Sequence, residues 1–372
     1  MKLPEYASFE DKMQYFETNQ KVIGNSWIIN TEQEFEEMFQ SIHQCQQKIN
    51  ECSKNTKIRF RESIYFKNAS EEQLQRHFIT MGLDNGLFFR GVCEAKYKIY
   101  TSAQRCWLEN EHGKKGLSYI NFIEGLLKQI RQNNLLHDYY TALRVPENDL
   151  LYMSLLQHYG QCSPLIDISY SIESSLYFAL DGANFKKTTN EIDNYCSLYI
   201  FNTYANQYWA TLDTILQEGQ EKAAELLEDL KHPVEMIDTS NIDSADKYTC
   251  WINANNNNRG LHDWALTLIK LPTANGAIMP ITRTGEHICW TNLNLLAQKG
   301  GFFLYTKDTT PLEEHIYHNQ ELPNVICFNI HKGLKDYILN RIRLTKDNIY
   351  PQMENIIKND IKAFTNNLQN KQ

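Results

Sequence analysis

The chain has 372 residues, of which 42% are hydrophobic, so it is long enough to bury a core without disulfides or a structural metal. The formal net charge of -8 and the lack of a long basic run argue against a protein that binds nucleic acid through its phosphates. The nine cysteines are scattered without a CxxC pair, the N-terminus has no apolar stretch of the signal-peptide kind, and no run of 18 apolar residues occurs, so we expect a cytoplasmic protein with no metal site and no membrane partner.

The first part of the chain predicts helices and strands in alternation. Residues 25–30 (NSWIIN) predict a short strand. A Thr-x-x-Glu capping box at Thr31 and Glu34 then begins a helix with apolar residues at helical spacing. A similar signal at 70–73 precedes a second helical pattern, and the apolar segment 87–92 (LFFRGV) predicts another strand.

The rest of the chain continues the alternation without a repeat. Helical spacing predicts helices over 118–130, 147–159 and 172–180, the last of them capped by Ser171, and strands are predicted at 196–201, 266–271 and 301–305. An insertion with one helix is expected at 202–263, and a helical C-terminal tail at 331–368. We therefore predict an α+β fold, a mixed central sheet flanked by helices, in a single domain spanning residues 1–372.

Four ordered blocks of residues carry a resemblance to a known family. They are Phe89-Arg90-Gly91, then Gln157-His158-Tyr159-Gly160, then Leu165 and Asp167 through Ser169 to Leu176-Tyr177-Phe178-Ala179, and last Asn292, Gln298, Gly300 and Phe302. Together they resemble the FRG-domain family of bacterial proteins, and the likeness extends over roughly residues 22–368. The chain departs from that pattern where Ser163-Pro164 replace Thr-Arg and where Asn294 replaces an arginine.

Arg90 is the most informative residue of these blocks, because it stands in an otherwise apolar strand. A buried guanidinium is costly unless it is paired, so an anionic or carbonyl-rich group must meet it. One interpretation is a structural ion pair with Asp167, Glu173 or Glu286. The other is an arginine that faces a ligand, with Gly91 allowing a ligand or another backbone to approach closely.

The second block ends a predicted helix. His158 continues the apolar face of that helix, which favours a hydrogen-bonded core histidine. The functional interpretation is that the helix end presents His158 and Tyr159 to a cleft, where histidine donates to a ligand or transfers a proton. Gln157 is expected to orient a loop.

Ser169-Tyr170-Ser171 precede a helix, and serine in that turn is typical of N-capping. The order of Arg90, Ser169 and Gln298 also resembles, more loosely, the Arg–Ser–Glu order of mono-ADP-ribosyltransferases. That likeness implies a similar core, an arginine that holds a dinucleotide and a serine that supports the site. A glutamine at the third position can bind a ribose hydroxyl but cannot act as a general base, and Glu286 is a candidate substitute.

Two functions remain open. The leading hypothesis is a cleft for a nucleotide-type ligand, with NAD as substrate rather than cofactor, Arg90, His158, Ser169 and Gln298 as catalytic candidates, and Arg90, Gly91, Tyr159 and Asp167 as ligand-binding candidates. Such a protein would be an ADP-ribosyltransferase-like effector that modifies a host or phage macromolecule. The alternative is a non-catalytic recognition module with a protein partner, in which the four blocks are structural.

Overall fold

The computed structural model describes residues 3–16, 27–62, 87–143, 149–160, 162–185, 188–202, 276–278, 293–305, 307–318 and 324–351. Several predicted features lie outside these residues. They are the capping signal at 70–73, all but the first residue of the insertion predicted at 202–263, the strand at 266–271, Glu286, Asn292 and the tail after residue 351.

A seven-stranded sheet forms the centre of the described structure, in the order β1-β7-β4-β2-β3-β6-β5. The strands are β1 (Ile28–Ile29), β2 (Leu87–Val92), β3 (Leu165–Ser169), β4 (Tyr195–Asn202), β5 (Gly276–Ile278), β6 (Gly300–Leu304) and β7 (Asn324–His331). The pair β1–β7 is parallel and the other neighbours are antiparallel. The prediction of an α+β fold with a mixed sheet is therefore confirmed.

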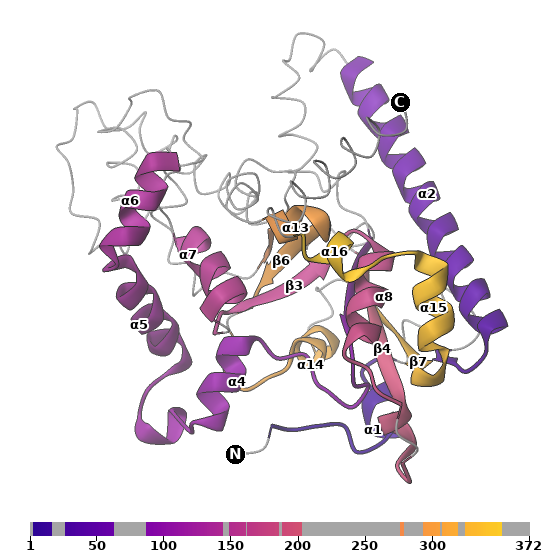
Figure 1. Ribbon diagram of the computed structural model, residues 1–372, viewed down its shortest axis with the longest axis horizontal. Coiled ribbons are helices and arrows are strands. Elements are labelled where there is room, and N and C mark those ends of the chain that lie inside the picture. The colour runs from indigo at the N-terminus through magenta and orange to yellow at the C-terminus, as the bar shows by residue number, and fades with distance from the viewer. Residues whose placement is uncertain are drawn as a thin grey trace, which may run out of the picture.

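Helices surround this sheet on both sides (Figure 1). The longer helices are α2 (Glu32–Glu62), α4 (Ser102–Glu109), α5 (Tyr119–Arg131), α6 (Asn134–Leu143), α8 (Ile172–Asp181) and α15 (Lys335–Ile342). The shorter ones are α1 (Phe9–Met13), α7 (Asp149–Leu155), α13 (Leu293–Ala297), α14 (Leu312–His318) and α16 (Lys346–Ile349). The predicted caps are present: the hydroxyl of Thr31 accepts from the Glu34 amide at 3.2 Å, and that of Ser171 from the Ser174 amide. Ser118, which was not predicted as a cap, accepts from the Asn121 amide at the start of α5.

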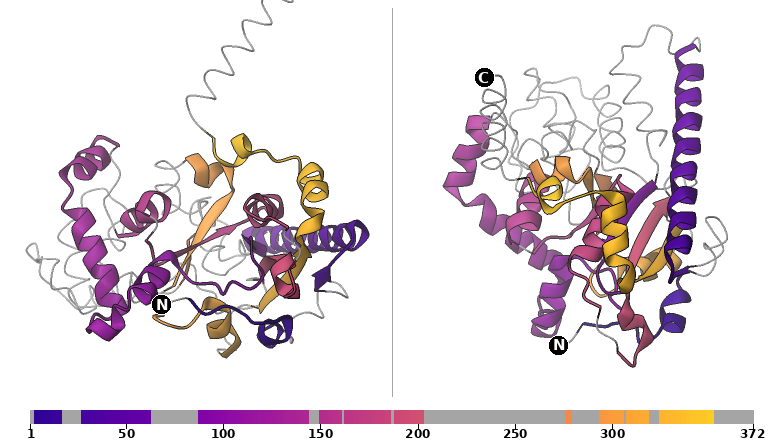
Figure 2. Two further views of the ribbon diagram at one scale, coloured as in Figure 1. Left: turned by 60° about the horizontal axis from the view of Figure 1, so that its bottom comes forward. Right: turned by 45° about the vertical axis from the view of Figure 1, so that its right-hand side comes forward.

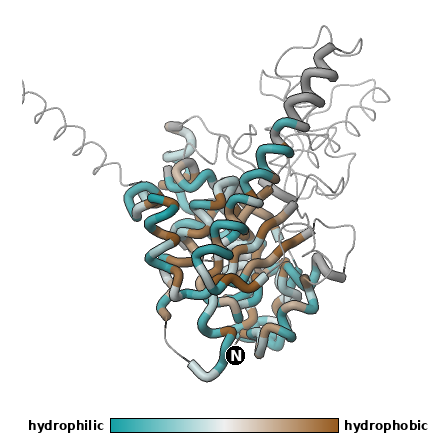
Figure 3. Tube along the Cα trace, turned by 90° about the vertical axis from the view of Figure 1, so that its right-hand side faces the viewer, coloured by the Kyte–Doolittle hydropathy of each residue, from teal (hydrophilic) through white to brown (hydrophobic). Residues whose placement is uncertain are grey.

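Strict alternation along the strands gives the sheet two apolar faces. In β2, Leu87 and Phe89 face a core formed with α2, α8 and α15, whereas Phe88 faces a core formed with the N-terminal segment and α14. A third cluster joins α4, α5, α6 and α7 to β3 and β6. The hydrophobic segments accordingly gather inside the molecule (Figure 3). The helix α2 runs along one side of the sheet and extends past it (Figure 2).

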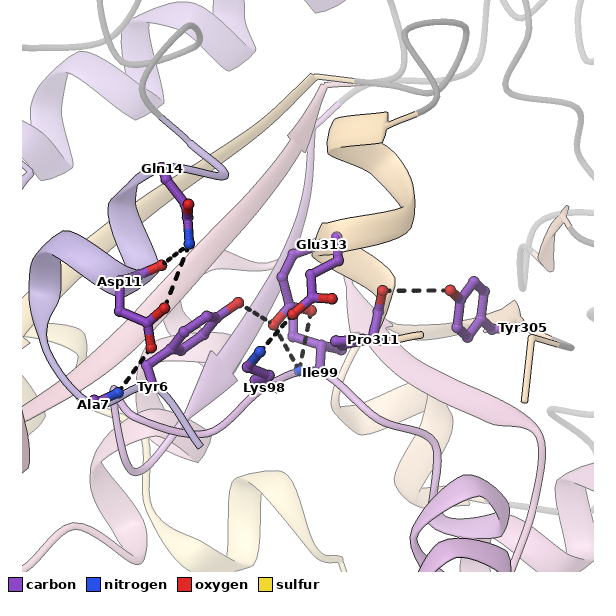
Figure 4. A network of polar contacts seen from close by, with 10 residues as sticks. Tyr6, Ala7, Asp11, Gln14, Lys98, Ile99, Tyr305, Pro311 and Glu313 are labelled. Atoms are coloured by element: carbon purple, nitrogen blue, oxygen red, sulfur yellow. Dashed lines mark hydrogen bonds and ion pairs between the residues drawn. The ribbon is translucent and has the colours of Figure 1, made fainter. Parts of the chain in front are cut away.

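Polar groups are buried under the N-terminal segment, on the second of these faces. The hydroxyl of Tyr6 donates to Glu313 Oε1 at 2.6 Å, and the Ile99 amide donates to the same carboxylate at 3.0 Å (Figure 4). Burial raises the pKa of Glu313. Lys12 is fully buried nearby and donates to the Ala95 carbonyl, Ser197 Oγ and Asn329 Oδ1. These contacts fix residues 3–16 to the sheet.

No helix in the described part of the chain is long and apolar enough to cross a membrane. Within the same residues, no group of three or more His, Cys, Asp and Glu side chains is placed to hold a metal ion.

Candidate functional site

The sheet opens between β2 and β3, and the candidate site lies at that opening. These two strands share one paired position, Phe89 with Ser169, whereas β2 pairs with β4 over six positions and β3 with β6 over five. Continuing the antiparallel register would bring Gly91 opposite Asp167, but no such pair forms. The backbone groups on the two sides of the opening therefore need other partners.

Arg90 supplies one of these partners. Its Nη1 donates to the backbone carbonyl of Asp167 at 2.6 Å and lies 4.0 Å from Asp167 Oδ2. The Arg90 side chain is 19% exposed, and its buried Nε has no hydrogen-bond partner among the described residues. Burial lowers the pKa of Arg90, and the nearby Asp167 opposes that effect. The guanidinium stays charged at neutral pH and keeps donor capacity that the described residues do not use.

Asp167 is the carboxylate of this site. Gln157 Nε2 donates to Asp167 Oδ2 at 2.7 Å, which orients the carboxylate, yet 52% of the Asp167 side chain remains exposed. The predicted pairing of Arg90 with Asp167 is therefore present, but it is long and open to solvent. Of the other acids proposed for Arg90, Glu173 lies 3.5 Å from His43 Nε2 instead, and Glu286 lies outside the described residues. Gln157 orients this carboxylate, whereas the sequence predicts that it orients a loop.

His158 lies on a π-helical turn, residues 156–160, that continues α7. The sequence predicts regular α-helix here, and the wider turn changes where the last side chains point; such turns are frequent at functional sites. The imidazole packs against Phe302 with ring centroids 5.8 Å apart, and its buried Nε2 has no partner among the described residues. Burial lowers the pKa of His158, and Asp167 opposes the shift. His158 is thus partly a core residue and partly a wall of the site.

Ser169 ends β3 and forms hydrogen bonds to the segment that precedes β6. Its Oγ donates to the Gln298 carbonyl at 2.7 Å and accepts from the Ser171 amide at 2.9 Å. Ser171, not Ser169, is the N-cap of α8. Ser169 therefore supports the site through backbone contacts.

Gln298 lies between α13 and β6, beside Ser169. Its Nε2 donates to the carbonyl of Ile349 at 3.1 Å and so holds the segment that follows α16. The sequence-predicted order of Arg90, Ser169 and Gln298 corresponds to three neighbouring strands, with Gln298 two residues before the third.

Gly91 and Tyr159 are both predicted to bind a ligand; Gly91 lines the pocket described below, but its close neighbour is the backbone of a helix. A Cβ on Gly91 would lie 1.8 Å from the Ser175 carbonyl oxygen and 2.6 Å from the Ala179 nitrogen. The backbone that Gly91 admits is therefore that of α8. The side chain of Tyr159 is 74% exposed, and it is not among the described residues that line the pocket.

A pocket of about 310 Å³ lies between β2, β3, β6, α8 and α13. It is lined by Phe89, Arg90, Gly91, Gln157, His158, Asp167, Ile168, Ser169, Ser175, Phe178, Leu295, Gln298, Gly300, Gly301 and Tyr350. The structure thus brings together Arg90, His158, Asp167, Ser169 and Gln298 from distant parts of the sequence.

Two aromatic lining residues are not identified by the sequence analysis as site residues. The rings of Phe178 and Tyr350 meet edge to face at 6.0 Å. Phe178 is half-buried beside fully buried neighbours on α8, and an aromatic residue out of phase with the core stripe of a helix is the local signal for it. Tyr350 reaches the pocket through tertiary contacts alone.

The position where the family has an arginine before the third block is apolar and buried here. Pro164 is buried and its carbonyl accepts from the Tyr305 amide at 3.0 Å, while Ser163 Oγ donates to the Met153 carbonyl at 3.0 Å. Neither residue lines the described pocket. Ser163 and Pro164 therefore supply no charge to the described pocket.

Comparison with known proteins identifies one relationship. A family model described as the FRG domain matches residues 85–188. This range contains Arg90, His158, Asp167 and Ser169 but not Gln298 or Tyr350, so the pocket extends beyond the matched segment. No curated protein and no solved structure matches the chain.

Proposed function

We propose, from the premise that the chain carries an FRG domain over residues 85–188, that its pocket binds a nucleotide-type ligand of the NAD class. On this proposal the protein is an ADP-ribosyltransferase-like effector that transfers part of the ligand to a macromolecule. NAD is then a substrate that is consumed and not a resident cofactor.

The observation that carries this proposal is the state of Arg90. Nη1 of its guanidinium is fixed by the Asp167 carbonyl, while Arg90 lines the pocket and its Nη2 makes no hydrogen bond to a described residue. A guanidinium held in place with free donor capacity at an open pocket is suited to bind a phosphate oxygen. A phosphate oxygen bound there would meet the guanidinium, with the Asp167 carboxylate 4.0 Å from Arg90 Nη1.

The arrangement around Arg90 adds support. Ser169 lies on β3, the strand next to the one that carries Arg90, and Gln298 lies just before β6, the strand next to β3. This order of polar residues resembles that of mono-ADP-ribosyltransferases. The amide of Gln298 can bind a ribose hydroxyl in addition to its bond to Ile349. Phe178 and Tyr350 offer an aromatic wall for a planar base.

The alternative function is a recognition module without catalysis, and specific contacts favour it. Gly91 is needed for the packing of α8, Ser169 bonds to backbone groups, and Gln298 holds Ile349. Each of these three motif residues therefore has a structural task. On this alternative a protein partner, and not a nucleotide, would use the surface around the pocket.

Thermal unfolding of the purified protein with NAD, ADP-ribose, AMP and GTP separates the two functions. We expect NAD and ADP-ribose to raise the melting temperature and the purified protein to release nicotinamide from NAD. Arg90→Gln should abolish both effects, whereas Arg341→Gln on α15, outside the pocket, should retain them. No shift with any nucleotide and no release of nicotinamide would favour the recognition module.

A further inference from the structure

The pocket contains one acidic side chain among the described residues that line it, and that residue is Asp167. Transfer of a ribosyl group from a nucleotide passes through a cationic, oxocarbenium-like carbon, which a nearby carboxylate stabilises. The glutamine at position 298 cannot supply that charge. The negative charge must therefore come from another residue of the same pocket.

Asp167 is held in a way that suits this task. Its Oδ2 accepts from Gln157 Nε2 at 2.7 Å, and its Oδ1 makes no hydrogen bond to any described residue. Arg90 Nη1 lies 4.0 Å from Oδ2 and is itself anchored on the Asp167 backbone. The carboxylate is thus oriented from one side and exposed to the pocket on the other.

Glu173, the other described acid considered for this role, is directed elsewhere. One carboxylate oxygen of Glu173 accepts from Ser171 Oγ at 2.6 Å, and the other lies 3.5 Å from His43 Nε2. It lines a separate groove between α2 and α15. Glu173 therefore does not contribute to the pocket around Arg90.

The neighbouring opposite charges also restrict the ligand. Arg90 and Asp167 would place an anionic group and a cationic carbon only a few bonds apart, as in one nucleotide unit. A volume of about 310 Å³ is near the lower limit for ligand pockets, about 300–1,000 Å³. That volume suits a mononucleotide better than a whole dinucleotide.

Building on the proposed function, we infer that the pocket accepts the nicotinamide mononucleotide half of the substrate, with its phosphate at Arg90 and its anomeric carbon at Asp167. The substrate class is then a nucleotide whose leaving base is cationic. In the step that follows, the bond between the anomeric carbon and the nicotinamide nitrogen breaks, and its electron pair leaves with neutral nicotinamide. The oxygen of water or of an acceptor hydroxyl bonds to the carbon, and its proton passes to the Asp167 carboxylate.

Gln157 is a positioning residue in this scheme, because it contacts the carboxylate and not the reacting carbon. Asp167→Asn is the sharpest variant, because the asparagine oxygen can still accept from Gln157 while the negative charge is removed. Asp167→Glu retains the charge on a longer side chain. Asp138→Asn, on the exposed face of α6, changes the net charge equally outside the pocket and serves as the matched control.

The experiment measures nicotinamide release from NAD and nicotinamide mononucleotide, together with calorimetric binding of ADP-ribose, which has no leaving base. We expect Asp167→Asn to lower release from both substrates by about 10²–10³-fold, to change the Kd of ADP-ribose less than about threefold, and to melt like the wild type. Asp167→Glu should recover part of the activity. Asp138→Asn should match the wild type.

The outcomes separate this inference from the proposed function. Unchanged release by Asp167→Asn, or loss of ADP-ribose binding together with release, would overturn the role of Asp167 and leave the nucleotide site in place. Release from NAD but not from nicotinamide mononucleotide would overturn the assignment of the half that is bound. If the wild type neither binds ADP-ribose nor releases nicotinamide, the proposed function fails and the inference fails with it.

Discussion

Arg90 and Asp167 are joined across the opening of the sheet, with the guanidinium Nη1 of the first donating to the backbone carbonyl of the second at 2.6 Å. The contact takes the place of a strand pair that the register between Phe89 and Ser169 would otherwise continue. Arg90 therefore closes the opening on one side and presents its remaining donors on the other. Stability and, on the proposed function, ligand binding should both depend on this one side chain.

Replacing Arg90 should lower stability according to the group that replaces it. Arg90→Ala removes a charge-assisted hydrogen bond from a mostly buried side chain and should cost about 1.5–3 kcal/mol of the free energy of unfolding. Arg90→Glu should cost more, because a second carboxylate then faces Asp167. Arg341→Ala, which removes an exposed ion pair with Glu36, should cost at most about 1 kcal/mol. Urea unfolding of the three variants measures these differences in the free energy of unfolding. Equally small losses for Arg90→Ala and Arg341→Ala would contradict a stabilising contact between Arg90 and the Asp167 carbonyl.

Gly91 is predicted to be indispensable for the packing of α8 on β2. A Cβ at this position would overlap the Ser175 carbonyl, so Gly91→Ala should cost about 3 kcal/mol or more. Gly125, in the middle of α5, has open space at its Cβ position, and Gly125→Ala should raise stability by about 0.5–1 kcal/mol. Thermal unfolding of both variants checks the pair, and a Gly91→Ala protein as stable as the wild type would contradict this packing.

The buried imidazole of His158 should make stability depend on pH. Burial lowers its folded-state pKa below the ordinary value of 6.5, so the unfolded chain binds a proton at a higher pH than the folded one. As the pH falls below 6.5, the wild type should lose stability relative to His158→Gln, by no more than about 1.4 kcal/mol per pH unit.

Urea unfolding of the wild type and of His158→Gln at pH 7.5, 6.5 and 5.5 measures the difference between their free energies of unfolding. His137→Gln, on the exposed surface of α6, is the control. If the free energy of unfolding of the wild type, relative to that of His158→Gln, stays constant or rises as the pH falls, the prediction is wrong. His158 would then bind its proton at least as readily in the folded as in the unfolded state.

Substitution of Gln298 tests the likeness to mono-ADP-ribosyltransferases, which have glutamate at the third position of the Arg–Ser–Glu order. Its amide donates to the Ile349 carbonyl, and a glutamate there would lose that bond and place a carboxylate beside a carbonyl oxygen. Gln298→Glu should therefore lower the melting temperature by a few degrees, as expected for about 1 kcal/mol. If the likeness to those transferases holds, Gln298→Glu should raise NAD cleavage, and nicotinamide release by the purified variant decides whether the carboxylate compensates for the lost contact.

The sequence predicts much of the local structure because local signals dominate there. The strand at 87–92, the helices capped by Thr31 and Ser171, the helix over 118–130 and the strand at 196–201 all follow from spacing and capping. It does not predict β3 or β7 as strands. The first is short and carries Asp167 among its apolar residues, and the second is buried on both faces, so its apolar run lacks the alternation of a half-exposed strand.

The candidate site could be predicted only in part, for a related reason. Residues 90, 158, 167 and 169 stand out because polar groups within apolar elements need partners, whereas residue 298 is found only through the resemblance to known proteins. The partners that these residues have in the structure depend on the single pair between β2 and β3 and on the π-helical turn at residues 156–160. Both features result from tertiary packing. For the same reason the sequence could not show that Gly91 serves α8 or that Tyr350 reaches the pocket.

The most direct test of the account is calorimetric titration of ADP-ribose into the wild type and Arg90→Lys. The charge is retained in this variant, but the planar donor group that bonds to Asp167 and faces the pocket is lost. We predict that the wild type binds one equivalent and that Arg90→Lys binds at least about tenfold more weakly, which is about 1.4 kcal/mol. The absence of binding to the wild type, or equal affinity in the variant, would contradict a nucleotide site at Arg90.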